Sequence, residues 1–146
     1  MVLTDLIGPL HLSIGPVILI SGVGLIILSL TNRFGRIIDR TRQLSVEYRS
    51  AVPKDQERIF AELQILTVRA KVIRRSNLLA VLSVLFVSLI IVALFWSALY
   101  SINISYLLMG FFFLSIFSLI FALVLLIYDL DLSLKALWIE LPDNLS

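Results

Sequence analysis

Three long apolar blocks that contain no charged residue constrain the fold of this chain more than any other feature. The blocks are residues 7–30, 78–102 and 104–128. A helix needs roughly 20 apolar residues to cross about 30 Å of hydrocarbon, and each block is long enough to do so. Lipid offers no hydrogen-bond partner to the backbone, so a spanning segment must be a helix or part of a closed barrel. The blocks lack the alternation of barrel strands and therefore predict an all-α membrane protein with three transmembrane helices.

The charged residues collect between the first and the second block. All but one of the twelve Lys and Arg residues lie within residues 33–75, and Lys135 is the exception. Short loops rich in Lys and Arg remain on the cytoplasmic side of a membrane. We therefore expect the N-terminus outside, the basic region in the cytoplasm and the C-terminus in the cytoplasm.

The basic region also has helical periodicity. Two amphipathic stretches flank a turn at residues 52–55, and their apolar residues recur at spacings of three and four. They predict a long cytoplasmic helical hairpin, resembling a coiled coil, between the first and second spans. The chain then divides into four parts: an outside N-terminus and first span (1–30), the basic hairpin (31–77), a pair of spans (78–128) and a cytoplasmic amphipathic tail (129–146).

The spans carry small residues at regular intervals. In the first span they recur every seventh residue, at Gly8, Gly15, Gly22 and Ser29. A seven-residue period keeps one seam facing a partner helix, so close packing is expected, and a pore lining or ligand groove is the functional alternative. Pro16 lies inside a helix of membrane length and is expected to kink it. In the third span, Ser115, Ser118 and Ala122 form a candidate packing face.

A polar motif follows the first span at the expected membrane boundary, and the second arm adds two arginines at the same level. The residues are Asn32, Arg33, Arg36, Asp39, Arg40, Arg74 and Arg75. Anionic headgroups attract such cations with about 1 kcal/mol per charge, so lipid phosphates are candidate ligands. The alternative is a membrane-exit anchor with a solvated salt-bridge face, in which Asn32 bridges helices and Asp39 pairs with Arg36 or Arg42. Nucleic acid is a poor candidate because the arginines crowd the membrane end of the hairpin.

The sequence offers little catalytic chemistry. It contains no Cys and a single histidine, His11, so no metal, cofactor or catalytic site is expected within one chain. No ionisable residue other than His11 lies inside a span, whereas proton relays and coupled transporters usually place a charged one there. We therefore do not expect an enzyme.

The segment 22–40, GVGLIILSLTNRFGRIIDR, resembles a family of small bacterial membrane proteins named domain of unknown function 2721. The likeness extends over nearly the whole chain, including SLKAL at residues 133–137. The resemblance implies three spans with a cytoplasmic loop in the bacterial inner membrane, and it implies no activity.

Three short spans bury little surface in a monomer, so we expect a homo-oligomer or a subunit of a larger assembly. The first functional hypothesis is a passive pore, such as an ion channel, or a membrane scaffold. An assembly factor or insertase with an Oxa-like three-helix core is an alternative, as is an accessory subunit of a larger membrane complex. A motor-type stator is disfavoured because the spans contain no carboxylate.

Overall fold

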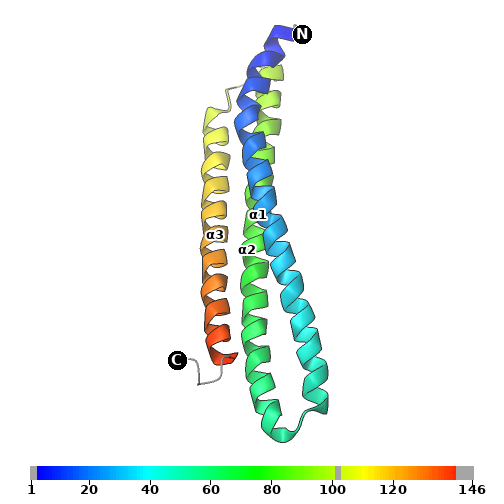
Figure 1. The fold of residues 1–146 in the computed structure, drawn as a ribbon. Coiled ribbons are helices and arrows are strands. Elements are labelled where there is room, and N and C mark those ends of the chain that lie inside the picture. The colour runs from blue at the N-terminus through cyan, green and yellow to red at the C-terminus, as the bar shows by residue number, and fades with distance from the viewer. Residues whose placement is uncertain (1–2, 101–102, 141–146) are drawn as a thin grey trace. The chain divides into compact units, whose positions relative to one another are not determined.

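The structure, a computed structural model, describes residues 3–100 and 103–140, and within them it consists of three long helices. These are α1 (Leu3–Ser50), α2 (Pro53–Tyr100) and α3 (Ser105–Glu140), shown in Figure 1. Each is long and apolar enough to cross a membrane, which confirms the prediction of an all-α protein with three candidate spans. All three helices contribute to each of two compact units, which divide α1 after Leu28, α2 after Asn77 and α3 after Ala122.

The second unit contains the turn that joins α1 to α2. The Val52 carbonyl accepts hydrogen bonds from the backbone N–H groups of Asp55 (2.9 Å) and Gln56 (3.2 Å). Pro53 begins α2, where its missing N–H removes no helical hydrogen bond. Residues 29–50 and 53–77 are thus the antiparallel arms of a helical hairpin (Figure 1).

The core of this hairpin repeats every seventh residue on both arms. The buried apolar residues are Leu30, Ile37 and Leu44 on α1 and Ile59, Leu66 and Ile73 on α2, and each is at most 6% exposed. A strict seven-residue repeat keeps one face of each helix against its neighbour in a left-handed crossing. The amphipathic pattern in the sequence therefore identified the packing face of both arms.

In the first unit, small and hydroxyl-bearing residues lie at the contact between α2 and α3, together with the stacked rings of Phe86 and Phe111. Ser83 and Ser115 are buried, and their hydroxyls lie 3.0 Å apart. Ser118 donates a hydrogen bond to the carbonyl of Leu79 at 2.7 Å, and Ala122 is 1% exposed. The predicted packing face of the third span is confirmed. Small residues let backbones approach closely, which is how helices associate in lipid.

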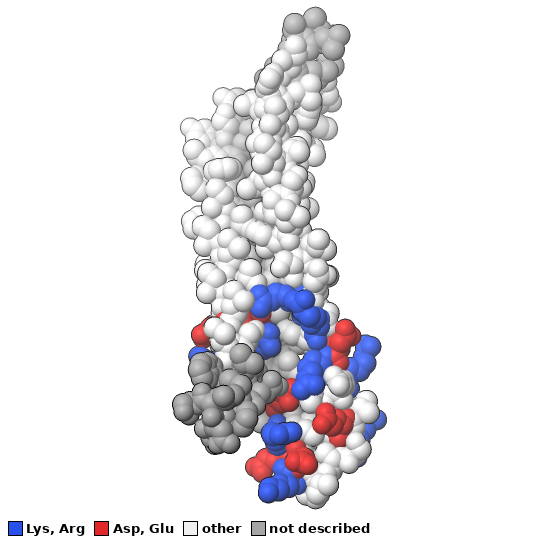
Figure 2. All heavy atoms as spheres, viewed as in Figure 1, with Lys and Arg blue, Asp and Glu red and all other residues white. Residues whose placement is uncertain are grey.

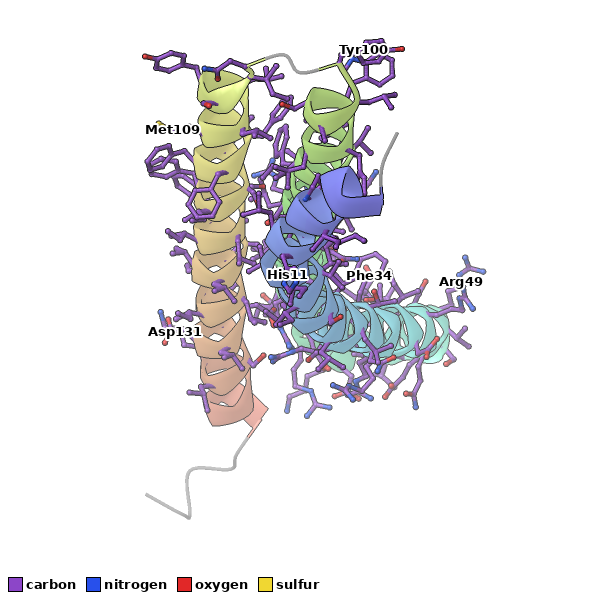
Figure 3. All side chains as sticks on the ribbon, turned by 90° about the horizontal axis from the view of Figure 1, so that it is seen from above. His11, Phe34, Arg49, Tyr100, Met109 and Asp131 are labelled. Carbon is purple, nitrogen blue, oxygen red and sulfur yellow. The ribbon has the colours of Figure 1, made fainter. Side chains whose placement is uncertain are left out.

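Much of the apolar surface in these helices is exposed. Each helix contains an 18-residue segment of high hydropathy. Only 11% of this segment is buried in α1, 22% in α2 and 17% in α3. Figure 3 shows Met109 on the outer side of α3 and Tyr100 at the end of α2, and both side chains are more than half exposed. Such a surface suits lipid or another protein and not water.

Two helix boundaries differ from the expected ones. α3 continues without a break to Glu140, so residues 129–140 extend the third helix and do not form a separate one. Residues 141–146 of the expected tail lie outside the described residues. α1 begins at Leu3, which places both Pro9 and Pro16 inside it. The position of Pro16 is as predicted, and its kink stays a prediction.

Candidate functional site

The described charged side chains all belong to the second unit. Figure 2 shows Lys, Arg, Asp and Glu gathered over this part of the molecule, while the remaining described surface in that view carries none. The candidate site lies among these residues, where α1, α2 and α3 contribute charged side chains.

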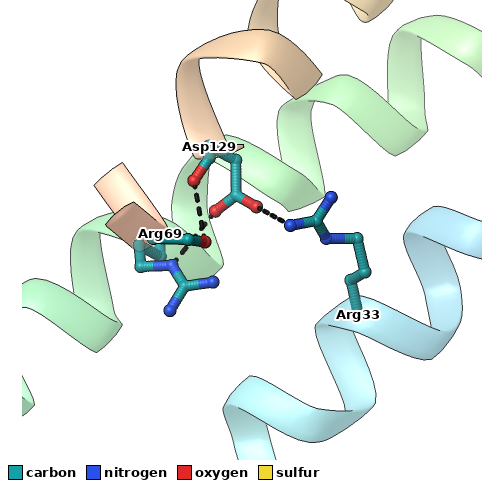
Figure 4. A network of polar contacts seen from close by, with 4 residues as sticks. Arg33, Arg69 and Asp129 are labelled. Carbon is teal, nitrogen blue, oxygen red and sulfur yellow. Dashed lines mark hydrogen bonds and ion pairs between the residues drawn. The ribbon is translucent and has the colours of Figure 1, made fainter. Parts of the chain in front are cut away.

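Asp129 on α3 is the centre of the most buried ionic contact in this part of the chain. Its side chain is 0% exposed and lies between two arginines (Figure 4). Arg69 Nε of α2 donates to Asp129 Oδ1 at 3.2 Å. Arg33 Nη2 of α1 lies 3.4 Å from Asp129 Oδ2, and this contact is an ion pair without hydrogen-bond geometry. One carboxylate therefore joins all three helices of the unit.

The helical repeat explains why Asp129 is buried. It lies seven residues after Ala122 and fourteen after Ser115, so the same face of α3 that packs in the first unit carries the carboxylate in the second. Burying an ion costs several kcal/mol unless partners compensate for the lost water. Arg33 and Arg69, whose side chains are 21% and 17% exposed, supply that compensation.

Asp131 shows the contrast two residues later. Its side chain points away from the other helices in Figure 3 and is 57% exposed. It pairs at 3.1 Å with Lys135 of its own helix, one turn away. Exposed pairs of this kind contribute about 0–1 kcal/mol. The two aspartates thus have different roles because they lie on different faces of α3.

A cavity of about 320 Å³ opens beside the ionic network. Arg33, Arg36, Arg40 and Arg69 line it together with Ile37 and Leu66. Arg40 is held by Glu62, with Nη2 and Nε at 2.9 and 3.1 Å from Oε1. The lining therefore combines four guanidinium groups with a small apolar surface.

The structure separates the arginines that the sequence grouped together. Arg33, Arg36 and Arg40 meet at the cavity, whereas Arg74 and Arg75 are exposed and do not line it. Asn32 and Asp39 are exposed as well. Neither expected pairing of Asp39, with Arg36 or with Arg42, is present among the described ion pairs.

Sequence reasoning missed the buried ion pair between Arg69 and Asp129. A signal for Asp129 was present, because it continues the seven-residue spacing of Ser115 and Ala122. The bridge expected at Asn32 is instead made by Asn77, whose Nδ2 lies 3.4 Å from Thr31 Oγ1. Thr31 and Asn77 directly flank the first and second apolar blocks, so the bridge forms where both helices leave those blocks.

The small residues at seven-residue spacing on α1 do not pack within one chain. Gly8, Gly15, Gly22 and Ser29 are all exposed, and a Cβ added at any of the three glycines meets nothing within 4 Å. His11 is also exposed on α1 (Figure 3). No group of three His, Cys, Asp or Glu residues suited to a metal ion occurs in the described part of the chain.

Comparison with known families assigns the chain to a family. A family model described as Protein of unknown function (DUF2721) matches residues 13–139. The chain belongs to this family. The matched segment of this DUF2721 protein includes Arg33, Arg69 and Asp129, so the ionic network lies within the family's own region. No curated protein and no solved structure matches the chain.

Proposed function

We propose that this protein is a non-enzymatic integral membrane protein that self-associates as a membrane scaffold. The observation that carries the proposal is the exposed seam of Gly8, Gly15, Gly22 and Ser29 on a helix apolar enough to span a membrane. Helices in lipid associate through close van der Waals contact, and small residues allow the backbones to approach. A second copy of the chain provides a complementary seam, because a two-fold interface uses the same patch on both subunits.

The substitution Gly22→Leu tests this proposal. We expect it to reduce the oligomer to monomers, since the leucine side chain separates helices that meet at the glycine. The mass of the complex in detergent, measured by native mass spectrometry or light scattering, reports the result. Gly24→Leu is the matched control: Gly24 is also exposed with nothing within 4 Å of an added Cβ, and at 100° per residue it faces nearly the opposite way. Equal masses for wild type and Gly22→Leu would contradict the proposal.

If the subunits associate as a closed ring, the oligomer can enclose a passive pore. The serines of the spans and the basic hairpin would favour anions in such a pore. Flux of anions and cations from liposomes that contain the purified oligomer distinguishes a pore from a scaffold. An insertase and an accessory subunit are alternatives. Crosslinking in cells to nascent membrane chains would favour the insertase, and crosslinking to one constant partner would favour the accessory subunit.

We also propose that the hairpin of residues 29–77 faces the cytoplasm of a bacterial inner membrane, with the N-terminus outside. The excess of Lys and Arg in this short region supports the orientation. The chain contains no Cys, so Lys54→Cys introduces a single thiol one residue after the start of α2. We expect this thiol to resist a membrane-impermeant maleimide in intact cells and to react after lysis. Labelling of this thiol in intact cells would show that the hairpin faces outward and would contradict the proposed orientation.

A further inference from the structure

The arginine-lined cavity of the second unit holds an excess of positive charge. Four arginines line it. Among the described residues, Asp129 pairs with Arg33 and Arg69, and Glu62 pairs with Arg40. Arg36 is exposed, lines the cavity and has no ion-pair partner among the described residues. These carboxylates hold three guanidinium groups in place, and the described side chains at the cavity carry more positive than negative charge.

We propose that this cavity binds a phosphate-bearing anion, supplied by the headgroup of an acidic phospholipid or by free phosphate. Guanidinium groups present planar arrays of N–H donors that match phosphate oxygens in paired hydrogen bonds. The volume of about 320 Å³ lies at the lower end of the range for small-molecule sites, which is about 300–1,000 Å³. Ile37 and Leu66 add an apolar surface that suits the glycerol or upper acyl region of a lipid.

The position of the cavity along α1 is consistent with a headgroup. The first apolar block ends at Leu30, so Arg33 and Arg36 follow it by about 4.5 and 9 Å at 1.5 Å per residue. The polar headgroup layer extends about 5–8 Å beyond the hydrocarbon on each side of a bilayer, so Arg33 lies near its inner edge and Arg36 about 1 Å beyond its outer edge, from where a long arginine side chain reaches back to the headgroups. This inference does not depend on self-association, because all the lining residues belong to one chain.

Arg36→Gln is the test variant, since it removes one cavity charge and breaks none of the ion pairs described above. Arg42→Gln is the matched control: Arg42 lies on the same helix, is exposed and does not line the cavity. Two probes are applied to delipidated protein in detergent. Inorganic phosphate is titrated by calorimetry, and phosphatidylglycerol is compared with phosphatidylcholine of the same chain length by native mass spectrometry. Circular dichroism verifies that both variants retain their helices.

We expect the wild-type protein to bind phosphatidylglycerol or inorganic phosphate. Arg36→Gln should weaken this binding about ten-fold or more, and Arg42→Gln should leave it unchanged. Retention of phosphatidylglycerol over phosphatidylcholine identifies a lipid headgroup, and saturable phosphate binding alone identifies a free anion. Two results would overturn the proposal: neither probe binds, or both variants weaken binding equally, which would show a general charge effect.

Discussion

The two units of this protein hold α3 by different chemistry. In the first unit the contacts are neutral, with the Ser83 and Ser115 hydroxyls 3.0 Å apart and Ser118 bonded to a backbone carbonyl. In the second unit a fully buried carboxylate, Asp129, lies between Arg33 and Arg69. The same face of α3 supplies both, because Ser115 and Asp129 are separated by two seven-residue repeats.

The difference between Ser115 and Asp129 shows that the environment of a helix face determines which residue suits it: neutral in the apolar unit, charged in the arginine-rich unit. An ion inside hydrocarbon is costly, so helices within an apolar segment associate through van der Waals packing and neutral hydrogen bonds. Where arginines from two other helices are available, a carboxylate can be buried and can bind both. The neutral contacts allow close approach of two helices, whereas the charged contact joins all three helices at one carboxylate.

Removal of the carboxylate should have the largest effect. Asp129→Ala leaves Arg33 and Arg69 largely buried without their partner, and breaking a buried ion pair in this way costs about 3–5 kcal/mol of unfolding free energy. Titration with SDS in mixed micelles, followed by circular dichroism, measures the change. Glu62→Ala is the control, because its pair with Arg40 is more exposed and should contribute at most about 1 kcal/mol. A loss for Asp129→Ala of about 1 kcal/mol or less, no larger than that for Glu62→Ala, would show that the buried contact does not stabilise the position of α3.

The neutral contact should contribute less. Ser83→Ala removes one of the two hydroxyls that meet between α2 and α3, and such interhelical hydrogen bonds contribute about 0.6 kcal/mol and at most about 1.7. Ser115 can still donate to the Ser83 carbonyl at 3.1 Å, which limits the loss. The same micelle titration applies. Ser88→Ala is the control, since Ser88 bonds within its own helix to Val84. A loss for Ser83→Ala as large as that for Asp129→Ala would remove the contrast between the units.

The exposed seam on α1 is a second point where sequence and structure give different information. The sequence identified small residues at every seventh position, but it could not distinguish packing within the chain from packing between chains. The structure shows that the buried apolar residues of α1 are Val23, Leu30, Ile37 and Leu44, which follow Gly22, Ser29 and the next two positions of that seven-residue series by one residue each. Two seven-residue repeats therefore lie next to each other on this helix: the apolar one is buried within the chain, and the small-residue one is exposed.

The sequence by itself determined the number of candidate membrane spans, their approximate limits and the packing faces of the hairpin arms and of the third span. It could do so because membrane length and helical periodicity are properties of one segment at a time. Only the tertiary structure decided that Asp129 meets Arg33 and Arg69, and that Arg36 rather than Arg74 or Arg75 lines a cavity. These contacts join residues up to 96 positions apart, and their existence depends on the register between helices, which no local pattern specifies.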